Sequence, residues 1–199
     1  MVDRIGTVRR LTPPATEPVT LAEAKKHLRI NTDFTKDDNY IQGLISSARD
    51  HAEKYCGRSW ATADFVWTVE ALTLSVYGSS QYKFKIPMQF ISSINEIGYL
   101  DSDSVDQVIA TSLIGLDSDR QWVTIPDTIE GSDWVIRFSA GPDLGTSQNE
   151  VTPDAIKQAI LLLVGDAYEN RQASILVVSI TENPAVVSLL HDYRVNMGV

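Results

Sequence analysis

The chain has 199 residues, of which 43% are hydrophobic and 22% charged, so wholesale disorder is excluded and one substantial core with a smaller inserted module is feasible. Its net charge of −9 disfavours tight wrapping of nucleic acid, because binding to the phosphate backbone draws on clustered Lys and Arg. The single cysteine, Cys56, excludes an intramolecular disulfide and a zinc site built from several thiolates, and we expect it to be a small buried side chain.

The apolar runs are short. The longest, AILLLV at residues 159–164, falls far below the roughly 20 residues that cross a bilayer. The start MVDRIGTVRR has no apolar stretch after its charges, unlike a signal peptide. We therefore expect a protein made in the cytoplasm, with no targeting segment and no membrane partner.

The N-terminal part predicts an extended lead followed by two helices. Residues 1–19 form the lead, which the prolines of TPPATEP stiffen. In EPVTLAEAKKHLRI, Thr20 can cap a short helix that ends near residue 30, and Glu23 completes a capping box. Residues 38–56 then show helical spacing of apolar side chains, with Gly57 placed to end the second helix. The two helices are expected to form a hairpin.

After Trp60 the period changes to that of strands. FVWTVEALTLSVY, residues 65–77, alternates and is rich in β-branched and aromatic side chains. Five further candidates follow at about ten-residue spacing, which predicts a small antiparallel sheet or barrel over residues 60–140. They are 82–86, 91–100, 105–109, 121–125 and 133–139.

The helical period returns in VTPDAIKQAILLLVGDAYENRQ. Thr152 is a good cap for this helix and Pro153 suits its first position. Its broad apolar face needs a partner, and the helix over residues 38–56 is the nearest one available. Residues 184–194 close the chain with a short amphipathic helix. The fold class is thus α+β: a bundle of about four helices, from residues 20–59 and 150–199, with an antiparallel β module inserted over residues 60–149.

The chemistry-bearing residues indicate a protein that is not an enzyme and needs no cofactor. His27, His51 and His191 lack metal-ligand spacing, and no nucleotide-binding or hydrolase motif occurs in the sequence. The DSDSVD stretch at residues 101–106 lacks the glycine and closing glutamate of a calcium loop, so a solvated hairpin turn is favoured.

Three aromatic residues could form a platform for a sugar or a base. Trp122, Trp134 and Phe138 lie on predicted strands, and at these spacings we favour a core role for them.

The order of these elements carries a resemblance. The capped TLAEAK start, the acidic pair at residues 37–38, YCGRSW, FKIP, FSAGP and the helix ending in YENR before LLHDYR follow one another over residues 18–194. Together they resemble the head-to-tail connector family of tailed bacteriophages, whose members are also known as adaptor, head-completion or DNA-packaging proteins. The resemblance implies a virion protein at the head-tail interface, in a ring of about twelve copies below the portal. It also implies portal and tail or neck proteins as partners, with DNA passing through the ring without sequence-specific binding.

Two groups of site residues follow. Residues 172–183 are neutral and β-branched, so they form either an edge strand folded onto their own sheet or a segment packed on another chain. We expect inter-subunit or portal contacts at Ile175, Leu176, Val177, Val178, Ile180, Leu189, Leu190 and Tyr193. An acidic channel wall or surface is expected from Asp37, Asp38, Glu53, Asp154 and Glu169.

A second function remains open at this point. The β insertion could recognise a carbohydrate or protein ligand while the helices serve as scaffold. Mass measurement separates the two, since a connector forms rings, alone or with portal, whereas a ligand-binding module stays small.

Overall fold

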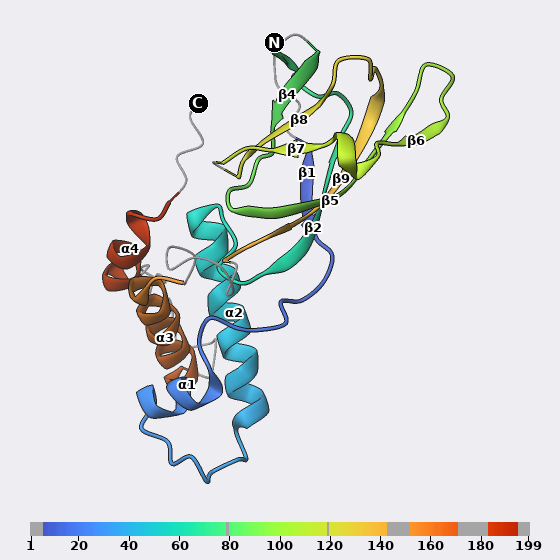
Figure 1. Ribbon diagram of the computed structural model, residues 1–199. Helices are drawn as coiled ribbons and strands as arrows, with labels where there is room; N and C mark the ends of the chain where they lie inside the picture. The colour runs from blue at the N-terminus through green and yellow to red at the C-terminus, as the bar shows by residue number, and fades with distance from the viewer. Residues whose placement is uncertain (1–5, 79, 119, 143–151, 171–182, 195–199) are drawn as a thin grey trace, which may run out of the picture. The chain divides into compact units, whose positions relative to one another are not determined.

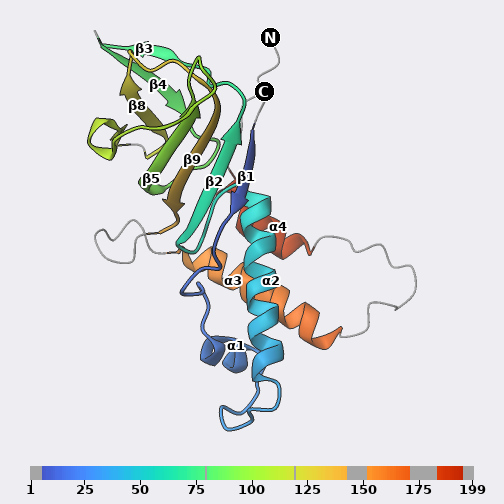
Figure 2. The same ribbon diagram turned by 90° about the vertical axis from the view of Figure 1, so that its right-hand side faces the viewer.

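The computed structural model describes residues 6–78, 80–118, 120–142, 152–170 and 183–194 (Figures 1 and 2). The chain divides into two compact units, each built from two separate stretches of sequence. The β unit comprises Met1–Ala15 and Ala61–Ser147, and the helical unit comprises Thr16–Trp60 and Gln148–Val199. Four helices and two small antiparallel sheets confirm the predicted α+β class.

The β unit contains two sheets. The five-stranded sheet has the order β1-β2-β9-β5-β6, and the four-stranded sheet has the order β3-β4-β8-β7, with every pairing antiparallel. A single-turn helix, Thr111–Leu113, precedes β7. The strands are β1 Thr7–Arg10, β2 Ala63–Val69, β3 Ser75–Tyr77, β4 Gln81–Lys85, β5 Ile91–Leu100, β6 Asp106–Val108, β7 Gly115–Leu116, β8 Trp122–Pro126 and β9 Ser132–Ala140.

Period-two alternation places one set of side chains from each sheet in a shared core. Phe65 stacks on Phe138 with ring centroids 5.8 Å apart, and Trp67 of β2 contacts Phe84 of β4 at 6.4 Å. Trp134 and Phe138 are fully buried, as expected for core aromatics, whereas Trp122 is only partly buried. Aromatic burial from both sheets therefore holds the unit together.

The stretch over residues 65–77 was expected as one strand and is two. β2 ends at Val69, and β3 begins at Ser75 in the other sheet. Alternation alone cannot separate these outcomes, because a strand that continues and a chain that crosses to a facing sheet both bury alternate residues.

The predicted N-terminal lead also contributes to the sheet. Residues 7–10 are extended and pair with β2, with Thr7 opposite Thr68 and Arg10 opposite Phe65. The sequence TVRR hides this strand, because Val8 is its one apolar residue and Arg10 meets the core by placing its guanidinium 5.3 Å from the Phe65 ring centroid.

The helical unit packs four helices around a second, separate core. They are α1 Leu21–His27, α2 Asp38–Cys56, α3 Asp154–Glu169 and α4 Pro184–His191. As expected, α2 and α3 are packing partners, and α1 and α4 contact both. The core is mainly isoleucine and alanine from α2 and α3, including Ile41, Ile45, Ile156 and Ile160. None of the described helices is long and apolar enough to cross a membrane.

The predicted capping box is present. The Glu23 N–H donates to Thr20 Oγ1 at 3.2 Å, and the Thr20 N–H donates to Glu23 Oε2 at 2.7 Å. The bond from the Thr20 N–H foremost, and a second one that the Thr20 hydroxyl donates to the same Glu23 Oε2 at 2.7 Å, lower the pKa of Glu23 because they favour its ionised form.

The start of α3 differs from the expectation. Pro153 is the N-cap residue, and the helix begins at Asp154. Thr152 is buried, and its hydroxyl donates to the Trp60 carbonyl at 3.0 Å instead of capping the helix. A buried hydroxyl needs a hydrogen-bond partner, and the carbonyl of Trp60, in the turn after α2, provides it.

Gly141 in the β unit should not tolerate a side chain. Its φ is +127°, and an added Cβ would lie 2.7 Å from the backbone of Ala61 and Thr62. We expect Gly141→Ala to lower the free energy of unfolding by about 1–3 kcal/mol, measured by chemical denaturation. Gly98→Ala is the control, because its nearest neighbours would lie at 3.7 Å or beyond; a loss as large as that of Gly141→Ala would contradict the explanation.

Candidate functional site

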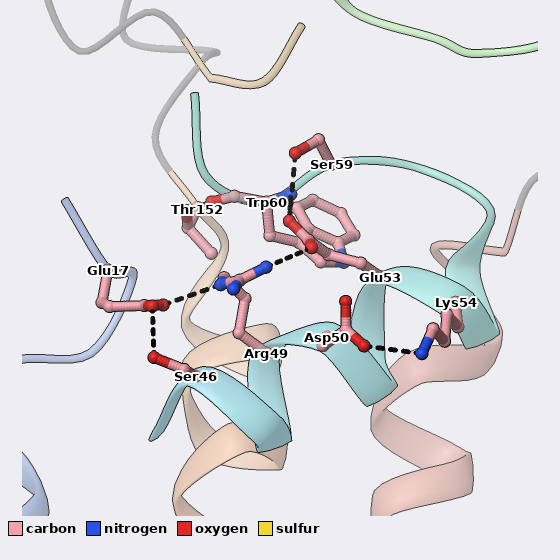
Figure 3. A network of polar contacts seen from close by, with 9 residues as sticks. All are labelled: Glu17, Ser46, Arg49, Asp50, Glu53, Lys54, Ser59, Trp60 and Thr152. Carbon is pink, nitrogen blue, oxygen red and sulfur yellow. Dashed lines mark hydrogen bonds and ion pairs between the residues drawn. The ribbon is translucent and has the colours of Figure 1, made fainter. Parts of the chain in front are cut away.

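The most prominent polar feature of the helical unit is a buried ionic network centred on α2 (Figure 3). Arg49 and Glu53 lie one turn apart on the same face of the helix, where helical spacing brings their side chains together. Their relative exposures are 5% and 6%, and Arg49 Nη1 lies 2.5 Å from Glu53 Oε2. Arg49 Nε also donates to Glu17 Oε2 at 2.8 Å. Two carboxylates therefore compensate one buried guanidinium.

Each carboxylate also binds a neighbouring segment. Glu53 Oε1 accepts hydrogen bonds from the Ser59 hydroxyl at 3.0 Å and from the Trp60 N–H at 2.8 Å. Glu17 Oε1 accepts one from the Ser46 hydroxyl at 2.8 Å. The network, extended by the hydrogen bond from Thr152 to the Trp60 carbonyl, fixes the segment before α1, the turn after α2 and Thr152, two residues before α3, to a single helix. The role of this network is therefore structural, because it holds three separate segments against α2.

A second buried cation organises the other end of the hairpin. Lys25 is 4% exposed, and its Nζ donates to the carbonyls of Thr32 at 3.2 Å and Phe34 at 2.8 Å. The same Nζ lies 2.5 Å from Asp38 Oδ1. Lys25 therefore holds the loop between α1 and α2 in one conformation, since its three donors are matched by three oxygens in that loop and the first turn of α2.

The five residues predicted to form an acidic wall fall into three environments. Asp154 and Glu169, at the two ends of α3, are exposed. Asp37 and Asp38 are partly buried: Asp37 accepts a hydrogen bond from the Tyr168 hydroxyl at 2.6 Å, and Asp38 pairs with Lys25. The prediction that Glu53 belongs to an acidic wall or surface is wrong, because its side chain is buried in the ionic network. Helical spacing showed it near apolar residues but did not reveal its partner Arg49 one turn away.

Among the predicted contact residues on and after α4, Leu190 needs correction, whereas Leu189 and Tyr193 are partly exposed and stay predictions. Leu190 is fully buried in the core of the helical unit, and Leu189 packs against the same core. Tyr193 meets Trp60 edge to face, with ring centroids 5.7 Å apart. A short amphipathic helix has one apolar face, and here its own unit uses that face. Ile175, Leu176, Val177, Val178 and Ile180 lie outside the described residues.

The thiol of Cys56 lies in the core of the helical unit. Cys56 is fully buried as expected, with its Sγ 3.7 Å from the Leu190 carbonyl oxygen, and burial raises the pKa of its thiol. A raised pKa keeps the thiol protonated and therefore weakly nucleophilic.

The DSDSVD stretch is a hairpin turn, as predicted. The Asp101 carboxylate accepts backbone hydrogen bonds from Asp103 at 3.0 Å and Val105 at 2.9 Å, and a side-chain bond from Gln107 at 2.8 Å. These bonds lower the pKa of Asp101. Across the described ranges, no group of three or more His, Cys, Asp or Glu could hold a metal ion.

Comparison with known proteins bears on this architecture. Residues 18–98, which span α1, α2, strands β2 to β4 and most of β5, match the family model described as phage gp6-like head-tail connector protein. The resemblance to head-tail connectors is confirmed. No curated protein matches the sequence.

Solved structures extend the likeness in fold to nearly the whole chain. A chain in the neck of an empty gene transfer agent (GTA) particle, computed with C6 symmetry, is 19% identical with a TM-score of 0.71, and the match covers 97% of each chain. One in the neck of the native particle, computed with C12 symmetry, is 18% identical with a TM-score of 0.67 and the same coverage. A third, in the virion of the native particle, is 21% identical with a TM-score of 0.65, covering 96% of this chain and 97% of that one. At these identities the likeness shows a shared fold.

The ionic network makes a prediction about stability. Glu53→Ala should lower the free energy of unfolding by about 3–5 kcal/mol, because it leaves Arg49 buried with one partly exposed partner. Denaturant unfolding followed by far-UV circular dichroism measures the change.

The control is the other ion pair on the same helix, Asp50 with Lys54, which are 42% and 78% exposed. Asp50→Ala should cost less than about 1 kcal/mol. Replacing both members of the buried pair, as in R49M/E53L, should be milder than Glu53→Ala alone, since no fully buried charge is left without a partner and the remaining Glu17 carboxylate is partly exposed. Equal losses for Glu53→Ala and Asp50→Ala would show that the network contributes no more than a surface pair.

Proposed function

We propose that this protein is a structural adaptor in the neck of a tailed phage or phage-like particle. It forms a ring below the portal, joins the DNA-filled head to the tail and lines the DNA channel. The observation that carries the proposal is the connector family match over residues 18–98, with the fold likeness to a neck chain over 97% of the protein. The C12 symmetry of the native GTA neck supports a ring of about twelve copies.

The charge of the protein suits a channel through which DNA moves. The net charge of −9 disfavours firm contact with phosphate, and the exposed carboxylates of Asp154 and Glu169 are available to repel it at short range. DNA would then pass without sequence-specific binding. The buried charges of the helical unit support a structural role as well, because Arg49, Glu53 and Lys25 are engaged with partners of the same unit.

Removing the protein from particle production tests the role directly. Without it, we expect DNA-filled heads that carry no tails, seen by electron microscopy, with tails restored when the protein is supplied from a second gene copy. Heads that join tails normally without the protein would contradict the proposal. A purified protein that stays small and is missing from necks would favour the ligand-binding alternative.

The segment over residues 172–183 is proposed to pack on an adjacent subunit or on the portal. On the described side, Asn183 belongs to α4: its side chain caps the helix by accepting the Ala185 N–H at 3.1 Å, and it donates to Asp166 at 2.9 Å. The segment therefore connects two helix ends that are anchored in the helical unit. Its apolar sequence, ILVVSI at residues 175–180, suits burial against a partner.

Deletion of residues 174–181 should leave a folded protein that no longer joins particles. Circular dichroism and a cooperative thermal melt report folding, and neck incorporation reports assembly. A variant with a Gly/Ser stretch of the same length in place of residues 174–181 is the control, because it preserves the connection between α3 and α4. Loss of folding in both variants would favour the alternative that the segment folds back on its own chain.

A further inference from the structure

We propose that neighbouring copies join by extending the five-stranded sheet, with strand β6 of one copy lying beside strand β1 of the next. This inference rests on the proposed ring and assigns part of its subunit interface. Both strands are edges of the same sheet, at its two opposite ends (Figure 1). Within the described residues, β1 pairs with β2 alone and β6 with β5 alone.

Open edges of this kind are templates for pairing with another chain, because their outward N–H and C=O groups seek hydrogen bonds. Native edge strands that stay solitary are usually protected by short length, by charged or inward-pointing side chains, by proline or by a covering loop, and both β1 and β6 are short and charged. Charges of one sign prevent like edges from pairing but permit pairing with an edge of the opposite sign. All three residues of β6 are exposed, and two exposed valines lie in or beside the strand, Val105 at 52% and Val108 at 65%. Pairing with a neighbour would cover apolar surface as well as backbone.

The outward side chains of the two edges lie on one face of the sheet. The registers form a continuous row from Thr7 through Thr68, Val135 and Gly98 to Val108. Since alternate residues share a face, Arg9 on β1 and Asp106 on β6 lie on this same face. Trp67 and Ile136 point to the opposite one, into the core. A sheet continued into the next copy therefore has Arg9 and Asp106 on one surface, and they lie opposite each other when the strands pair with residue 9 of one copy beside residue 106 of the next.

The two edges have opposite charge. The β1 strand TVRR has two arginines and no acid, and Arg9 is exposed. Residues 101–110 around β6, DSDSVDQVIA, contain three aspartates and no basic residue, with Asp103 and Asp106 exposed. Pairing β1 with β1, or β6 with β6, would oppose like charges, whereas β6 with β1 opposes unlike ones. The charges thus select a head-to-tail contact.

The strand directions fit a closed ring. Successive antiparallel pairings through five strands leave β1 and β6 running the same way. Copies related by rotation about a ring axis keep similar orientations, so β6 of one copy meets β1 of the next as a parallel pair. Each copy offers one edge of each kind, which is the property of a heterologous interface that closes on itself.

Charge reversal tests the interface. Arg9→Glu and Asp106→Arg should each raise the protein concentration for half-maximal ring formation, measured by mass photometry with portal present, by about tenfold or more. The double variant R9E/D106R restores unlike charges at every contact and should assemble within about twofold of wild type. Lys85→Glu is the matched control: it makes the same charge change at an exposed position of β4 and should leave assembly unaffected.

Cross-linking provides a second measurement on the same protein. Cys56 is the only native cysteine and is buried, so new surface thiols react without competition from it. In the pairing that sets Arg9 opposite Asp106, the exposed Leu11, which continues β1 beside β2, lies opposite Val108 of the next copy. In a Leu11→Cys/Val108→Cys chain the two sites are at least four strand spacings apart, about 19 Å, too far for a bond within one copy. Oxidation should therefore give a ladder of linked copies, whereas either single variant should stop at dimers.

The outcomes separate this inference from the proposed function. Rings and necks that form equally well with Arg9→Glu, with Asp106→Arg and with wild type, and that yield no ladder, would overturn the edge pairing while leaving the adaptor role intact. Wild-type protein that forms no ring with portal and is absent from necks would overturn both.

Discussion

A buried positive charge organises the helical unit. Arg49 lies inside it, where an uncompensated guanidinium would be costly, so two carboxylates must stay beside it. Glu53 comes from the same helix, but Glu17 lies outside any helix, and the remaining oxygens of both are engaged by Ser46, Ser59 and Trp60. The need to neutralise one side chain thereby fixes where the chain enters and leaves the helical unit. Packing of α2 on α3 buries apolar surface, and the ionic network fixes the positions of the segments that precede and follow the helices.

Much of the fold could be predicted because local signals and tertiary packing agree. The helix over residues 38–56 and the strand over residues 91–100 match their predicted bounds, and the Thr20 capping box is formed as expected. Long periodic segments bounded by a glycine or proline leave few alternatives. The confirmed resemblance to head-tail connectors likewise rested on the order of such elements.

The misses share a physical cause: they depend on partners distant in sequence. β1 has too few apolar residues to be recognised as a strand without its partner β2. The Thr152 hydroxyl does not cap α3 but donates to a carbonyl 92 residues away in the sequence. Glu53 is an exception, because its partner Arg49 is only one helical turn away, and the helical spacing does not show that this pair is buried. The apolar face of α4 could pack on the core of its own unit or on a neighbouring subunit, and the spacing of apolar residues in the sequence is the same in both cases.

Both units are interleaved along the chain, and this affects how they can be made. β1 is synthesised first but pairs with β2 about sixty residues later, with α1 and α2 in between. The helical unit, in turn, lacks α3 and α4 until the whole β unit has emerged. Such long-range closure slows folding and leaves edges and apolar faces uncovered on the way. It also means that neither unit corresponds to a contiguous fragment: a piece starting at Ala61 would present the edge of β2, and a piece ending at Trp60 would expose the face of α2 that α3 covers. Engineering or recombination that treats the β unit as a cassette would therefore have to carry residues 6–15 along with it.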